Sequence, residues 1–133
     1  MLARVRRIAL LGVVFAAVGA PTLAAAAGGC GPVVVEQLTG PTFNGVVPSG
    51  RATADESQFL CGGSTVLTVE VKDVNLPDGT VLQVALDFLP VGTITLSRMA
   101  GAVAADLGHF AVSNDMVRVI HQGNVILIGP FFR

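Results

Sequence analysis

Apolar and polar residues alternate with a period of two along the middle of this chain, and this pattern restricts the fold more than any other feature. Every second residue of LTVEVK (67–72) is apolar, and LQVALDF (82–88) repeats the pattern from Leu82 to Phe88. Such alternation is typical of a strand that buries one face. No helical period is evident after residue 27. The pattern therefore predicts half-buried strands, in which Ile94 and Leu96 also point inward.

Short segments rich in Gly, Pro, Asn and Asp separate these runs at regular intervals. LPDG (76–79) predicts a turn, because Pro presets φ and Gly tolerates a positive φ. We interpret LPVG (89–92) as a further link between strands. Such spacing indicates a small antiparallel β-sandwich, or a partly open barrel, of about seven to eight strands. The strand candidates are residues 33–38, 51–54, 57–60, 65–72, 82–88, 93–98, 103–107, 117–119 and 125–128.

The first 27 residues have the order of a secretory signal peptide. Arg4, Arg6 and Arg7 precede an apolar run from Ile8 to Ala20, and Pro21 and small residues follow it. The run has 13 residues, fewer than the ~20 that span a bilayer. We predict a cleaved signal-peptide helix over residues 1–27 and a single secreted or periplasmic β-domain over residues 28–133, with no membrane span after cleavage. Retention as a signal anchor is the alternative.

The composition of the exported part argues against several partners. It carries five basic residues against nine acidic ones, a formal charge of −4, and the basic residues form no stripe. A nucleic-acid partner is therefore not expected. The chain has no Trp and no Tyr, which argues against carbohydrate binding and against an outer-membrane barrel.

The two cysteines, Cys30 and Cys61, both lie in the exported part. An even number of cysteines in an oxidising compartment predicts a disulfide. The alternative is a lipoprotein anchored through Cys30, because Ala27, Gly28 and Gly29 form a small-residue box before it. No CxxC pair is present, so the cysteines do not indicate a zinc site.

His109 and His121, with Met99 and Met116 near them in sequence, are candidate metal ligands, since imidazole and thioether suit copper. Their spacing matches no Cys-His-Met copper motif. We therefore assign no metal and no cofactor, and keep a copper site as an alternative.

The carboxylates suggest no catalytic motif. Asp73 and Asp78 flank Asn75 but lack the spacing of a calcium loop. Asp87 and Asp106 would act as an acid and a base only if the fold brought them together. The chain also lacks a GxSxG motif and a phosphate-binding loop. We predict that the protein is not an enzyme.

The last strand candidate is apolar on both faces. Val125, Leu127, Phe131 and Phe132 are the candidate interaction residues of this C-terminal segment. A strand that is apolar on both faces is either covered within the sheet or exposed as a sticky edge. The first reading predicts burial in the core, and the second predicts self-association by strand addition.

From Leu67 to Phe131 the chain resembles a family of secreted bacterial β-sandwich modules of unknown function. The matching segments are VEVKDVNLPDGTVLQV, VGTITL and NVILIGPF, together with the earlier LTGPTFNGVVPSGRA. HFAVSN (109–114) stands where such modules have a Pro-containing loop. The resemblance implies a β-fold and carries no catalytic residues.

These observations lead to an expectation about function. We expect a non-catalytic structural or interaction module of the cell envelope or the secreted fraction, with an unknown protein or envelope partner. The alternatives are a periplasmic protein that binds a small ligand or copper, and a lipoprotein anchored through Cys30.

Overall fold

The computed structural model describes residues 30–131, so the predicted signal peptide and Phe132 lie outside the described residues. Strands dominate this part of the chain, and a short 3-10 helix, η1, lies between β3 and β4. The elements are β2 (Val33–Thr39), β3 (Ser49–Asp55), η1 (Phe59–Cys61), β4 (Val66–Lys72), β5 (Val81–Leu86), β6 (Leu89–Thr95), β7 (Gly101–Asp106), β8 (Met116–His121) and β9 (Asn124–Pro130).

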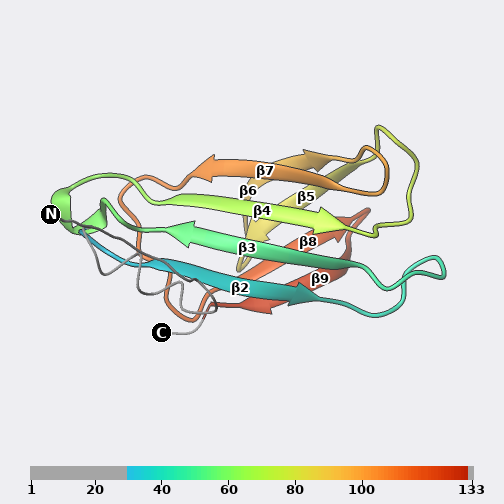
Figure 1. The fold of residues 1–133 in the computed structure, drawn as a ribbon, viewed down its shortest axis with the longest axis horizontal. Helices are drawn as coiled ribbons and strands as arrows, with labels where there is room; N and C mark the ends of the chain where they lie inside the picture. Colours follow the sequence, from blue (N-terminus) through green and yellow to red (C-terminus); the bar gives the residue numbers. More distant parts are fainter. Residues whose placement is uncertain (1–29, 132–133) are drawn as a thin grey trace, which may run out of the picture.

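The eight strands form one antiparallel sheet in the order β6-β5-β8-β9-β2-β3-β4-β7. The sheet curls until its two edge strands, β6 and β7, approach each other, which gives a nearly closed barrel. Figure 1 shows β2, β3, β4 and β7 on the near side and the other four strands behind them. The predicted all-β fold, with an antiparallel sheet of seven to eight strands, is confirmed.

The core fills the space that the curled sheet encloses, as in other small barrels. The alternation along β4 is confirmed, because every second side chain from Leu67 to Val71 is buried. Ile94 and Leu96 are also buried, as predicted. The largest fully buried apolar side chains are Phe131, Leu38, Leu67, Leu82, Ile94, Leu96 and Leu127.

Two predictions about the positions of strands were wrong. The predicted link 89–92 belongs to β6, because the chain reverses at Asp87 and Phe88 and Leu86 pairs with Leu89. Asp87 takes the left-handed turn conformation with φ 54°, which Asp tolerates better than most residues. Phe88 is therefore 86% exposed at the tip of the hairpin and does not point inward. A turn without Gly or Pro gives no conspicuous sequence signal.

The second error concerns residues 57–60, which form a turn and η1 where a strand was expected. The Asp55 carboxylate accepts a hydrogen bond of 3.0 Å from the Ser57 N–H and bends the chain at the end of β3. Hydrogen bonds from the Ser57 side chain and from its N–H lower the pKa of Asp55. The Leu60 N–H then donates to the Cys30 carbonyl. Side-chain hydrogen bonds of this kind compete with strand pairing.

A β-bulge explains why the last strand is apolar on both faces. Val119 pairs with Leu127 but Ile120 pairs with Val125, so Ile126 is the extra residue on β9. A bulge reverses the in–out alternation at that point. Ile126 and Leu127 are consequently both buried.

Candidate functional site

A disulfide joins Cys30 and Cys61, whose Cα atoms lie 5.4 Å apart. It ties the segment that precedes β2 to the last residue of η1. The Cys30 N–H also donates to the Ser57 carbonyl in the same turn. The pair predicted from the sequence is thus at disulfide distance, which is consistent with an oxidising extracytoplasmic compartment.

The buried side chain of Glu56 contacts the loop between β7 and β8 at the same end of the barrel. Glu56 is buried and accepts a hydrogen bond from the Val112 N–H, which fixes the loop between β7 and β8. The Thr65 hydroxyl, also buried, donates to the Phe110 carbonyl of that loop. Sequence reasoning missed Glu56, because a single acidic residue after a strand resembles an ordinary turn residue.

The two candidate histidines contact aromatic residues that flank opposite ends of β3. His109 stacks on Phe59, which follows β3, with ring centroids 4.2 Å apart. His121 meets the edge of Phe43, which precedes β3, at 6.0 Å. The His121 Nδ1 atom is buried and has no hydrogen-bond partner among the described residues.

The two candidate methionines are separated in the same way. Met99 lies in the turn between β6 and β7, whereas Met116 begins β8 and pairs with Pro130. The fold does not assemble these sulfur atoms and the two imidazoles into one site. Within residues 30–131, no three His, Cys, Asp or Glu side chains are arranged to hold a metal ion.

The polar residues of the weighed calcium loop bind neighbouring loops. Asp78 accepts a hydrogen bond of 2.8 Å from the Arg98 N–H, which connects the LPDG turn to the β6–β7 turn. Asn75 donates to the Asn44 carbonyl at 2.7 Å. Gly79 has φ 87° and the Thr80 N–H donates to the Pro77 carbonyl, so the predicted turn is present at residues 77–80, one residue later than expected.

Asp87 pairs with Asp115, which sequence reasoning did not consider. The two side chains are hydrogen-bonded to each other, and Asp87 also accepts the Met116 N–H at 2.9 Å. The Met116 N–H and the bond to Asp115 lower the pKa of Asp87. Burial, together with the Asp87 carboxylate, raises the pKa of Asp115. The pair therefore retains one proton more readily than two isolated carboxyls would.

Replacing Asp115 by Asn is expected to stabilise the protein at neutral pH. A raised pKa contributes stability that is fully present below the ordinary value of 3.8 and is lost as the pH rises through the folded-state pKa. Asn keeps a donor toward Asp87 and an acceptor for the Ser113 N–H, and it cannot ionise. Urea unfolding of both proteins should give equal free energies of unfolding in acid and a growing advantage for D115N toward neutral pH.

The lowered pKa of Asp87 changes the free energy of unfolding with pH in the opposite direction. Its stabilising contribution is present above pH 3.8 and is lost as the pH falls through the folded-state pKa. Because Asp115 also affects the pKa of Asp87, the difference between the wild type and D115N reports on the pair as a whole. The control is Asp73→Asn, an exposed residue in the loop after β4. Equal pH profiles for the wild type and D115N would contradict the shared proton.

The candidate interaction residues of the C-terminal segment lie in different environments. Leu127 and Phe131 are fully buried, whereas Val125 is 43% exposed. Strand β9 is flanked by β8 and β2, and the Phe131 N–H donates to the Asp115 carbonyl at 2.8 Å. Leu127 and Phe131 are thus inaccessible to a partner while the chain stays folded.

The edge strands β6 and β7 face each other along a line that we call the barrel seam. An apolar depression of about 290 Å³ lies on it. Gly92 on β6 lies against Val103 on β7, so these edge strands approach closely there. Further along the seam lies the depression, which we call the seam pocket. It is lined by Leu86, Leu89, Pro90, Val91, Asp106, Leu107 and Phe110. Pro90 has no N–H, so it also limits strand addition at this edge.

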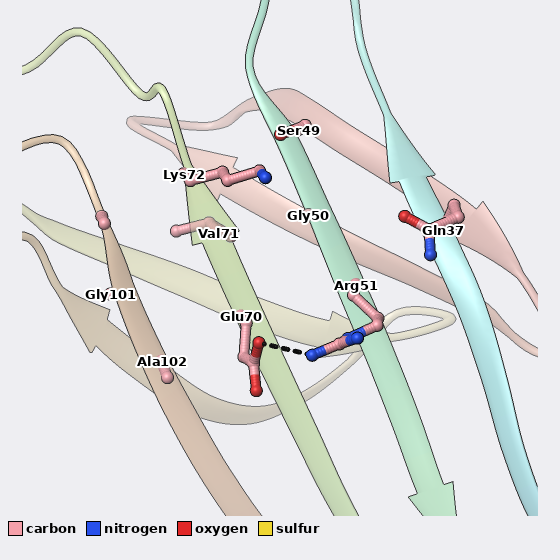
Figure 2. Close-up of a pocket in the computed structure, with 10 residues that line it drawn as sticks. Gln37, Ser49, Gly50, Arg51, Glu70, Val71, Lys72, Gly101 and Ala102 are labelled. Carbon is pink, nitrogen blue, oxygen red and sulfur yellow. Dashed lines mark hydrogen bonds and ion pairs between the residues drawn. The ribbon is translucent and has the colours of Figure 1, made fainter. Parts of the chain in front are cut away.

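A second, polar depression of about 420 Å³ lies over β3, β4 and the start of β7. We call it the outer groove. Figure 2 shows Arg51 extending from β3 toward Glu70 on β4, and Lys72 extending from β4 toward β3. Arg51 and Glu70 form an ion pair at 3.1 Å, and both side chains are about half exposed. The groove is lined by Gln37, Ser49, Gly50, Arg51, Glu70, Val71, Lys72, Ala100, Gly101 and Ala102.

No protein-family model, curated protein or solved structure matches this chain. Along residues 30–131, no helix has the length and the apolar character needed to cross a membrane.

Proposed function

We propose that this protein is a non-catalytic interaction module that works outside the cytoplasm and assembles with a second copy of itself. The order of charged, apolar and small residues in the first 27 positions supports export. The Cys30–Cys61 disulfide supports an oxidising compartment. A sulfur atom held in that disulfide is not available for a lipid anchor, which favours a free, exported domain over a lipoprotein.

The observation that carries the proposal is the β5–β6 hairpin. Phe88 protrudes at its tip with 86% of its surface exposed. Leu89, the next residue, is 64% exposed and lines the seam pocket. Phe88 and Leu89 thus form a contiguous exposed apolar patch beside the seam pocket, and such patches mark interaction surfaces. The protruding ring and the apolar pocket lie on either side of one hairpin, so a two-fold axis can place each ring in the pocket of the other copy.

The charges around the hairpin fit the same arrangement. The guanidinium of Arg118 lies 4.7 Å from the centroid of the Phe88 ring, and the Asp87 carbonyl holds it there at 2.7 Å. Asp106 lines the seam pocket. When Phe88 enters the pocket of the other copy, its attached cation approaches the carboxylate there. Complementary charges of this kind fix the orientation of an interface.

Replacing Phe88 by Ser is expected to weaken self-association at least tenfold, because a buried aromatic residue at the centre of an interface carries much of the binding energy. Sedimentation velocity over a range of protein concentrations measures the effect. The matched control is Val81→Ser, since Val81 is 54% exposed at the start of β5, away from the hairpin tip. A wild-type protein that stays monomeric, or equal association of both variants, would refute the proposal.

A further inference from the structure

The outer groove is built from two neighbouring rows of side chains on the outside of the sheet. Cross-strand pairing places Gln37, Arg51, Glu70 and Ala102 in one row across four strands. In the next row Ser49 pairs with Lys72. Arg51 and Lys72 are therefore diagonal neighbours on adjacent strands, and the Cβ atoms of such neighbours are separated by roughly 7–8 Å.

Small residues leave the space around these two cations open. Ser49 lies opposite Lys72 on β3, and Ala102 lies opposite Glu70 on β7. The result is an indentation where a sheet surface normally carries long side chains.

The charge of the outer groove differs from that of the domain. The described residues contain four basic and nine acidic side chains. Two of the four basic side chains, Arg51 and Lys72, line the groove, and Glu70 is its single acidic residue among those described. The Glu70 carboxylate engages one guanidinium nitrogen of Arg51, whereas Arg carries five N–H donors in all. Lys72 forms no ion pair within the described part of the chain.

We propose that the outer groove binds a small organic anion through a carboxylate or phosphate group held between Arg51 and Lys72. The planar Arg side chain offers paired donors to such oxygens, and Lys adds a compact positive charge. The Ser49 hydroxyl and the Gln37 amide are placed to hydrogen-bond the rest of the molecule. A volume of about 420 Å³ exceeds what a bare inorganic anion needs. This site is separate from the seam pocket and does not depend on self-association.

Amide chemical shifts of the purified ¹⁵N-labelled protein test the proposal during titration with citrate and with inorganic phosphate, each at ionic strength matched with chloride. We expect saturable shifts at Arg51, Lys72 and Ala102. Saturation by citrate alone identifies a carboxylate ligand, and saturation by phosphate alone identifies a phosphate ligand. Changing Lys72 to Gln should weaken binding about tenfold, the usual loss for one charge-assisted hydrogen bond.

Two variants separate a built site from general attraction to positive charge. Ala102→Leu fills the groove without changing any charge and should abolish the saturable shifts. Arg98→Gln removes an exposed cation from the β6–β7 turn, outside the groove lining, and should leave binding unchanged. The proposal is wrong if neither probe saturates, if K72Q and R98Q weaken binding equally, or if A102L binds as the wild type does.

Discussion

Truncating Phe131 to Ala is expected to lower the free energy of unfolding by about 3–5 kcal/mol, the usual cost of removing a large aromatic side chain from a core. Phe131 is the largest of the fully buried side chains, and it follows β9 directly. Hydrogen bonds to neighbouring strands hold the sheet around this side chain in place. The cavity left by the truncation therefore cannot easily collapse. Urea unfolding followed by circular dichroism measures the change.

The matched control for this experiment is Val125→Ala on the same C-terminal segment. Val125 is 43% exposed, so its truncation should change the unfolding free energy by no more than about 0.5 kcal/mol. Phe131→Leu, which keeps most of the volume, should cost less than about 1.5 kcal/mol and remains measurable if the Ala variant fails to fold. Equal effects of the Phe131 and Val125 truncations would show that the C-terminal segment is not part of the core.

Removing the disulfide should have the second large effect. Changing both Cys30 and Cys61 to Ser is expected to lower the unfolding free energy by about 3–4 kcal/mol, because the crosslink restricts the unfolded chain. The bridge joins residues 31 positions apart. Thermal unfolding with and without reductant measures the effect.

The double Ser variant also serves as the control for the reductant. Reductant should destabilise the wild type to the level of the variant and leave the variant itself unchanged. If reductant has no effect on the wild type, the two cysteines are not crosslinked in solution. The lipoprotein alternative at Cys30 would then regain support, and intact-mass measurement would detect the acyl chains.

The sequence was most informative where local alternation and burial coincide. Leu67, Val69 and Val71 were expected on one face of a strand, and all three are buried on β4. The LPDG turn was equally readable, because Gly79 needs its positive φ. These features depend on residues close together in the chain, so a one-dimensional pattern records them.

The candidate sites were less readable, because they depend on residues far apart in the chain. Asp87 was weighed as a partner of Asp106, but the curled sheet pairs it with Asp115. The outer groove joins Arg51 and Lys72 through the pairing of β3 with β4. Each of these residues alone resembles an ordinary exposed side chain on a sheet, and only strand register brings the two cations together.

Local patterns in the chain were enough to establish an all-β domain and the buried face of its central strands, and they favoured pairing of the two cysteines. Those properties follow from the hydrophobicity and the spacing of neighbouring residues. Three features became apparent in the folded chain alone: the sheet closes against its own edges, the hairpin turn exposes Phe88, and a bulge buries both Ile126 and Leu127. Closure, register and bulges depend on contacts between distant strands, and the energies of those contacts are not encoded in any short segment.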